Sequence, residues 1–157
     1  MRTFTHLLLI GLVGLLPMFA QFGNKKSMTL DAAKQIASAA EAEARKNNWN
    51  VVIAIIDEGG NLVYLQRMDG TQIASIEVAQ AKAKSAFGFK RPTKVFEDAV
   101  VGGRNAILKL PGAMPINGGI PIMAGEQIVG AIGVSGVTSD QDAQIASAGV
   151  AAASKMK

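Results

Sequence analysis

The chain has 157 residues, of which 49% are hydrophobic and 18% are charged. This length and balance fit a single globular domain and exclude a disordered or collagen-like chain. There is no cysteine, and the single histidine, His6, lies in a segment that we expect to be removed. The mature chain therefore excludes structural zinc sites, iron–sulfur clusters and catalytic triads built on histidine or cysteine. The net charge is only +4, and the sequence contains no run of four basic residues. We therefore expect no nucleic-acid partner.

Residues 1–20 have the pattern of a secretory signal peptide. Arg2 gives a positive start, residues 7–16 (LLLIGLVGLL) are apolar, and Ala20 is a small residue at the end of the apolar segment. The segment is shorter than the roughly 20 residues that a membrane-spanning helix needs, although an uncleaved anchor is the alternative. We expect cleavage after Ala20, a polar leader over residues 21–28, one domain over residues 29–157, and a secreted or periplasmic protein without a membrane span.

The first half of the domain is expected to form a helix and a hairpin. Thr29 can cap a helix whose alanine and isoleucine residues recur at helical spacing until Asn47. Trp49–Asp57 is apolar and rich in β-branched residues, which predicts a strand covered on both faces. Glu58–Asn61 contains the two glycines of a tight turn, and Leu62–Asp69 returns as the antiparallel partner.

The second half is expected to form two helices, two strands and a last helix, over residues 73–87, 92–111, 120–125, 127–136 and from 139 onward. Strands that follow each other through tight turns pair antiparallel. Because the strands are apolar on both faces, helices must cover both sides of the sheet. The pattern predicts the α/β class in its α+β form.

Three glycines, Gly130, Gly133 and Gly136, recur at a period of three within one expected strand. Their spacing is GxxGxxG, which differs from the GxGxxG of dinucleotide-binding loops, and no helix follows at once. We interpret them as positions where a helix lies close to the sheet.

The segment Asn117-Gly118-Gly119 precedes a strand. Two glycines there can leave backbone N–H groups unpaired and directed outward, which would form a small anion-binding nest. An ordinary loop with positive φ angles is the alternative interpretation.

Two cations lie at unusual positions. Lys82 falls on the border of the apolar stripe of its expected helix, so it either extends its stem along the sheet or places its ammonium at the mouth of a pocket. Arg67 lies among apolar strand residues, where an unpaired guanidinium would be costly. Its partner is either an acid such as Asp57 or Asp69, or an anionic ligand held by the planar guanidinium.

Four segments resemble the GlcG/HbpS family, which also supplies the C-terminal domain of PduO-type proteins. Residues 68–70 read MDG, 82–86 read KAKSA, 117–122 read NGGIPI and 125–136 read GEQIVGAIGVSG. The resemblance runs from about Met28 to Ala153. It implies a profilin-like fold with a five-strand antiparallel sheet, homo-oligomers, and haem binding by secreted relatives. The family's frequent positions fall on Asp57, Arg67, Asp69, Gly70, Lys82, Gly118, Gly119, Pro121, Gly133, Ser135, Gly136 and Asp142.

Haem or a related tetrapyrrole is the ligand that this resemblance favours. Family members that use histidine have no counterpart in the mature chain, which leaves Tyr64 and Met68 as axial candidates. Arg67 or Lys82 would pair with the propionates. The complete expected ligand-binding set is Arg67, Lys82, Tyr64, Met68, Gly118, Gly119 and Pro121, with no other metal site.

We therefore expect a secreted protein that binds a small ligand and functions in haem or iron handling or sensing. Two alternatives stay open at this point. One is an enzyme acting on small acids through Lys82, which burial could convert into a base or nucleophile. The other is a structural partner protein for a sensor.

Overall fold

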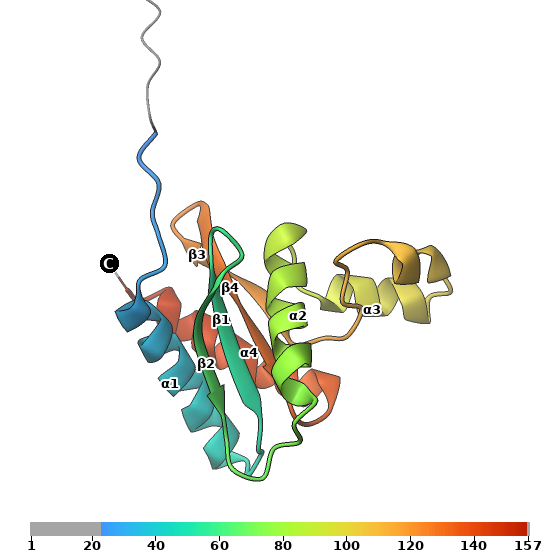
Figure 1. Cartoon of the computed structure of the whole chain (residues 1–157), viewed down its shortest axis with the longest axis horizontal. Coiled ribbons are helices and arrows are strands. Elements are labelled where there is room, and N and C mark those ends of the chain that lie inside the picture. The colour runs from blue at the N-terminus through green and yellow to red at the C-terminus, as the bar shows by residue number, and fades with distance from the viewer. Residues whose placement is uncertain (1–22, 157) are drawn as a thin grey trace, which may run out of the picture.

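The computed structural model describes residues 23–156, so the expected signal peptide and the first leader residues lie outside the described part (Figure 1). Across residues 23–156, the helices are all too short or too polar to cross a membrane. The elements in chain order are α1 (Leu30–Lys46), β1 (Val52–Asp57), β2 (Leu62–Arg67), α2 (Ser75–Gly88), α3 (Lys94–Val101), the 3₁₀ helix η1 (Asn105–Lys109), β3 (Gly119–Ala124), β4 (Gln127–Ser135) and α4 (Ser139–Ala153).

The four described strands form one antiparallel sheet in the order β2-β1-β4-β3. The expectation of a fifth strand, which came from the family resemblance, is wrong for this chain. The two expected hairpins supply all four strands, and β1 joins β4 at the centre, with Ile53 opposite Val134 and Ile55 opposite Ile132. Because β1 and β4 have a neighbour on each side, their backbone polar groups are paired and their side chains are buried.

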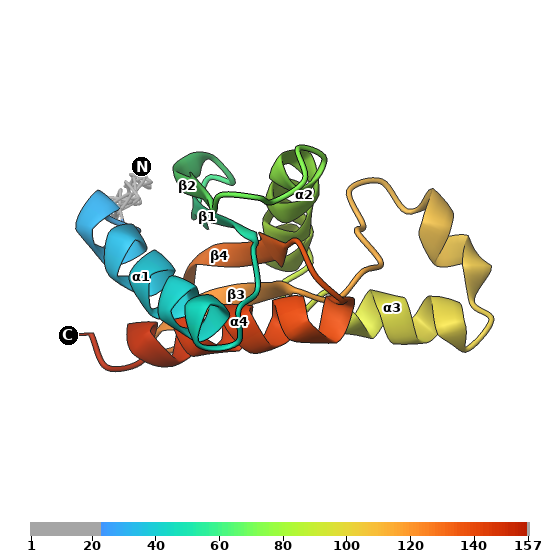
Figure 2. The same ribbon diagram turned by 90° about the horizontal axis from the view of Figure 1, so that it is seen from below.

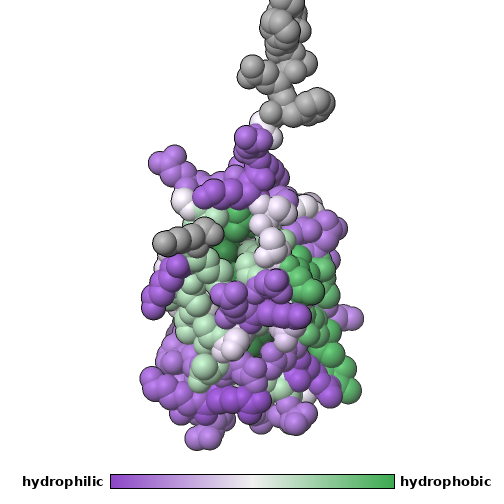
Figure 3. Space-filling view, turned by 90° about the vertical axis from the view of Figure 1, so that its left-hand side faces the viewer, coloured by the Kyte–Doolittle hydropathy of each residue, from purple (hydrophilic) through white to green (hydrophobic). Residues whose placement is uncertain are grey.

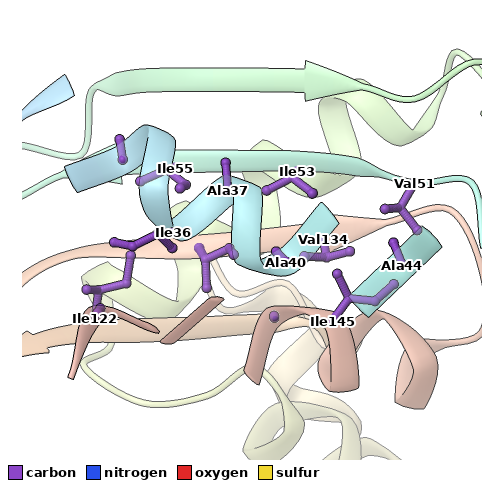
Figure 4. Close-up of a cluster of buried hydrophobic side chains, with 14 of the residues drawn as sticks. Ile36, Ala37, Ala40, Ala44, Val51, Ile53, Ile55, Ile122, Val134 and Ile145 are labelled. Carbon is purple, nitrogen blue, oxygen red and sulfur yellow. The ribbon is translucent and has the colours of Figure 1, made fainter. Parts of the chain in front are cut away.

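Helices cover both faces of the sheet, as the apolar strands predicted (Figure 2). Helices α1 and α4 pack on one face, where Ile36 and Ile145 join the cluster that contains Ile53 of β1 (Figure 4). Helix α2 packs on the opposite face, where Ala79 meets Val52. The alternation of side chains along β1 therefore divides one strand between two hydrophobic layers.

Helix α2 lies unusually close to β4 because Gly133 has no side chain. A Cβ on Gly133 would overlap the carbonyl oxygen of Ala79. The interpretation of Gly133 as a close-approach position is confirmed. Gly130 and Gly136 are also crowded, but by the backbone of Ile56 and Asn50 rather than by a helix.

The expected helix over residues 92–111 is wrong in extent. Helix α3 ends at Val101, and Gly102 and Gly103 follow, with Gly103 at a φ of +90°. A residue in this left-handed conformation stops an α-helix, so the chain turns and continues as η1. The last helix begins at Ser139, as expected, and Thr138 caps it in a reciprocal capping box with Gln141.

Candidate functional site

A cavity of about 400 Å³ opens between the start of α1, the β3–β4 hairpin and the end of α4. This volume lies within the range of small-ligand sites. The lining is mainly apolar and includes three methionines. The lining residues are Lys26, Ser27, Met28, Thr29, Ala32, Ile36, Ile122, Met123, Ala124, Gly125, Val129, Ala153 and Met156.

The leader residues that border this cavity are held against the domain. The backbone N–H of Lys26 donates to Gln127 Oε1 at 3.0 Å, and Gln127 Nε2 donates to the Lys26 carbonyl at 2.8 Å. The N–H of Met28 donates to Glu58 Oε2 at 3.3 Å. Residues 26–28 therefore form one wall of the cavity, and the Met28 side chain joins the main core.

The cavity combines soft, apolar and cationic groups. Met28, Met123 and Met156 contribute flexible thioethers that adapt to the shape of a ligand. Lys26 is exposed, and its Nζ lies 3.8 Å from the position that a Cβ on Gly125 would take, beside the β3–β4 turn. In Figure 3, green hydrophobic atoms lie directly below the purple, hydrophilic residues at the top of this side of the molecule. Such a site suits a ligand with a large apolar body and an anionic edge.

Lys82 is not at the mouth of a pocket. Its side chain is 1% exposed, and its Nζ donates to Asp142 Oδ2 at 2.7 Å and to the Val134 carbonyl at 2.9 Å. The N–H of Val137 donates to Asp142 Oδ1 at 3.2 Å. Burial raises the pKa of the Asp142 carboxyl from its ordinary value, while the Lys82 ammonium opposes that shift. The pair ties α2, β4 and α4 together in the interior.

The expected anion nest at residues 117–119 does not form. All three backbone N–H groups have internal acceptors: Asn117 donates to Glu97 Oε2, Gly118 to Asn117 Oδ1, and Gly119 to Thr93 Oγ1, at 2.8–2.9 Å. The two glycines are needed for space instead. A Cβ on Gly118 would lie 2.9 Å from Lys82 Nζ, so this loop closes over the buried ion pair.

The candidates on β2 and beside it are separate from the cavity. Arg67 is exposed, and within residues 23–156 it forms no ion pair, so the predicted pairing with Asp57 or Asp69 is wrong. Tyr64 is half-buried, and its hydroxyl donates to Gln66 Oε1 at 3.2 Å. Met68 is buried in the main core, against which Tyr64 also packs. The side chains of Tyr64 and Met68 lie on the same side of the sheet, as the two-residue alternation predicted, and α1 covers this side.

Sequence reasoning missed the cavity residues. Met123, which is outside the expected ligand-binding set, is 40% exposed and lines the cavity. Pro121, which the sequence analysis included in the ligand set, is on the edge strand β3, where a missing N–H is tolerated. Its neighbour Ile122 lines the cavity instead. The sequence offered one signal of this cavity, a methionine near each end of the domain, Met28 and Met156. These two residues come close to each other only when the chain folds.

The fold and the cavity define an α+β protein with a mainly apolar cavity between two helices and a hairpin. The chain belongs to the family described as haem degrading protein HbpS-like, whose model matches residues 28–151.

Relatives within this family cover most of the chain. Protein GlcG of Escherichia coli K12 is 41% identical over 112 residues, which are 71% of this chain and 84% of the relative. A crystal structure of a double mutant of HbpS from Streptomyces reticuli is 31% identical with a TM-score of 0.75, covering 88% of this chain and 97% of that one. The crystal structure of a PduOC:heme complex is 26% identical with a TM-score of 0.73, covering 81% and 95%.

Proposed function

We propose that this chain is a secreted or periplasmic protein that binds haem or a related tetrapyrrole and self-associates. The signal-peptide pattern of residues 1–20 supports export. The heme complex of a relative with the same fold supports the ligand. The observation that carries the proposal is the 400 Å³ cavity, because its apolar lining, thioethers and single rim cation match an apolar macrocycle with carboxylate side chains.

The residues present fit haem on chemical grounds. Methionine sulfur is an established axial ligand of haem iron, and three methionines line the cavity. Ile36, Ile122 and Val129 would exclude water from the macrocycle, and Lys26 would pair with a propionate. When bound, haem would supply its own iron and redox chemistry. The residues of this chain would hold the haem, orient it and limit its access to solvent.

The first experiment measures haem binding and its position. Haemin is titrated into tag-free protein while the Soret band is recorded. Ala32→Phe, which fills the cavity, is expected to weaken binding at least tenfold, while Ala151→Phe on the exposed side of α4 leaves it unchanged. A Soret band identical to that of free haemin at micromolar protein would refute haem binding. Equal binding by both variants would place the site outside the cavity.

A second set of variants identifies the groups that contact the ligand. Met28→Leu, Met123→Leu and Met156→Leu keep an apolar side chain but remove the sulfur, so loss of a spectral signature in one of them identifies an axial thioether. Tyr64→Phe and Met68→Leu test the axial ligands that the sequence analysis proposed. Lys26→Glu should weaken binding most at low salt, because an exposed ion pair is screened by added ions. Lys34→Glu on the exposed side of α1 serves as its matched control.

A further inference from the structure

Residues 94–116 form an arm that leaves the domain and returns to the same point. At its base the N–H of Thr93 donates to the Gly119 carbonyl at 2.9 Å, and the N–H of Gly119 donates to Thr93 Oγ1 at 2.9 Å. Between these points the arm contains α3 and η1 and extends beyond the edge of the sheet (Figures 1 and 2). The base is fixed, while the outer part projects from the domain.

The arm exposes an apolar surface that a monomer leaves without a partner. Within the described residues, nine large hydrophobic side chains are exposed, and five of these are in the arm. Val101 is 83% exposed and Leu108 is 58% exposed. Helix α3 has eight residues and packs mainly against η1. A helix of this length has little stability in water without packing partners, so a docked partner would stabilise the arm.

The arm also carries cations that lack an internal partner. Arg104 and Lys109 flank the exposed apolar residues, and neither forms an ion pair with any residue from 23 to 156. A partner surface that complements the arm therefore needs an apolar depression and an acid.

The outer side of α2 has an acid and a shallow hollow, which Ala81 lines together with three polar side chains, Lys84 among them. Glu77, Gln80, Ala81 and Lys84 line a shallow hollow of about 210 Å³, and Ile73, which precedes α2 in the chain, is 75% exposed. Glu77 likewise has no ion-pair partner in the described part of the chain. In Figure 2 no other ribbon lies over the side of α2 that faces away from the sheet.

The arm and the hollow of one copy do not meet. In the same copy the arm contacts α2 near its C-terminal end, through Met114, whose N–H donates to Ser85 Oγ at 2.9 Å, and through the edge-to-face rings of Phe96 and Phe89. Glu77 is near the other end of α2. We infer that the arm of one copy docks on the outer side of α2 in a second copy, with Val101 or Leu108 at the hollow and Arg104 beside Glu77. Exchange of two arms about a two-fold axis closes this contact without forming a filament.

This inference rests on the self-association in the proposed function and names its surface. Sedimentation velocity of the full chain measures the association. Val101→Asp and Leu108→Asp are expected to raise the dissociation constant at least tenfold, because each buries an unpaired charge in the contact. Leu62→Asp, at an exposed site on β2 outside the arm, is the control that leaves association unchanged. Circular dichroism checks that each variant is folded.

A charge exchange tests the pairing itself. Glu77→Arg and Arg104→Glu should each weaken association, and the double variant should restore it, because the ion pair is re-formed with its charges reversed. Oligomers that persist in all arm variants, or a double variant that is not rescued, would overturn the inference while leaving self-association intact. A wild-type monomer at every concentration would instead refute the self-association that was proposed. If that monomer binds lipid vesicles through the arm, the partner of the arm is a membrane surface and not a second copy.

Discussion

Lys82 Nζ lies 2.7 Å from Asp142 Oδ2, and the two side chains are 1% and 3% exposed. The residues are 60 positions apart, so their contact joins α2 to the start of α4. A buried pair of this kind is weak evidence of net stabilisation, but removal of one partner leaves a buried charge without compensation.

Lys82→Met is therefore expected to lower the free energy of unfolding by about 3–5 kcal/mol. The double variant Lys82→Met/Asp142→Asn should lose clearly less than the sum of the single variants, because no charge is then left alone. Urea denaturation at neutral pH measures both. A loss below about 1 kcal/mol in the single variant, or strict additivity, would contradict the assignment of this pair as a structural connection.

Gly133→Ala should destabilise the protein through steric overlap. The added methyl group would meet the backbone carbonyl of Ala79, which cannot move without shifting α2 relative to β4. We expect a loss of at least about 1–3 kcal/mol, as for overpacked cores. Gly88→Ala is the matched control, because a Cβ there contacts nothing within 4 Å. Thermal unfolding compares the two, and equal melting temperatures would show that α2 and β4 separate easily.

Asp57 should make the free energy of unfolding depend on pH in acidic solution. Its Oδ1 accepts the backbone N–H groups of Asn61 and Gly59, each at 2.8 Å. The N–H of Asn61 is the main reason that the pKa of this carboxyl is lowered. Because the folded pKa lies below the unfolded value, this contribution is complete above the unfolded pKa and is lost as pH falls through the folded pKa.

The variant Asp57→Asn keeps an oxygen acceptor but removes the charge. Wild-type protein should be more stable than this variant at pH 7, and the difference should shrink as the pH falls below about 4, the ordinary aspartate pKa. Urea midpoints measured across this range test the sign. A difference that is constant, or that grows in acid, would show that the carboxylate does not stabilise the turn.

Thr93→Val should loosen the base of the arm. The substitution keeps the side-chain volume but leaves the buried N–H of Gly119 without its Thr93 Oγ1 acceptor. An unsatisfied buried donor costs about 1–3 kcal/mol. Hydrogen exchange should become faster in residues 94–116, while the amides of β4 in the sheet centre provide the internal reference. Unchanged exchange in the arm would show that its base is held by other contacts.

Local patterns predicted the regular elements well. Trp49–Asp57 and Leu62–Asp69 contain the strands β1 and β2, and Thr29 caps α1 as expected through its hydroxyl and the N–H of Ala32. These features depend on alternation, turn residues and caps, which act over a few positions. The helix expected over residues 92–111 was too long, because its apolar residues continue at helical spacing past the glycines that end α3.

The candidate site was predicted less well. Lys82 and Arg67 were both recognised as unusual, but the sequence could not show that Asp142 lies beside Lys82 or that Arg67 faces solvent. A buried lysine and a rim lysine have the same helical position. Only the partner packed against the helix distinguishes them, and that partner comes from a distant part of the chain.

The sequence by itself determined the class of fold, the two hairpins, the helices on both sides of the sheet and the family. It could do so because hydrophobic periodicity and turn chemistry are local properties. Tertiary structure alone decided where a ligand could enter. Met28 and Met156 approach the β3–β4 hairpin only after α1 and α4 pack on the same face of the sheet, and a cavity exists only between elements that folding has brought together.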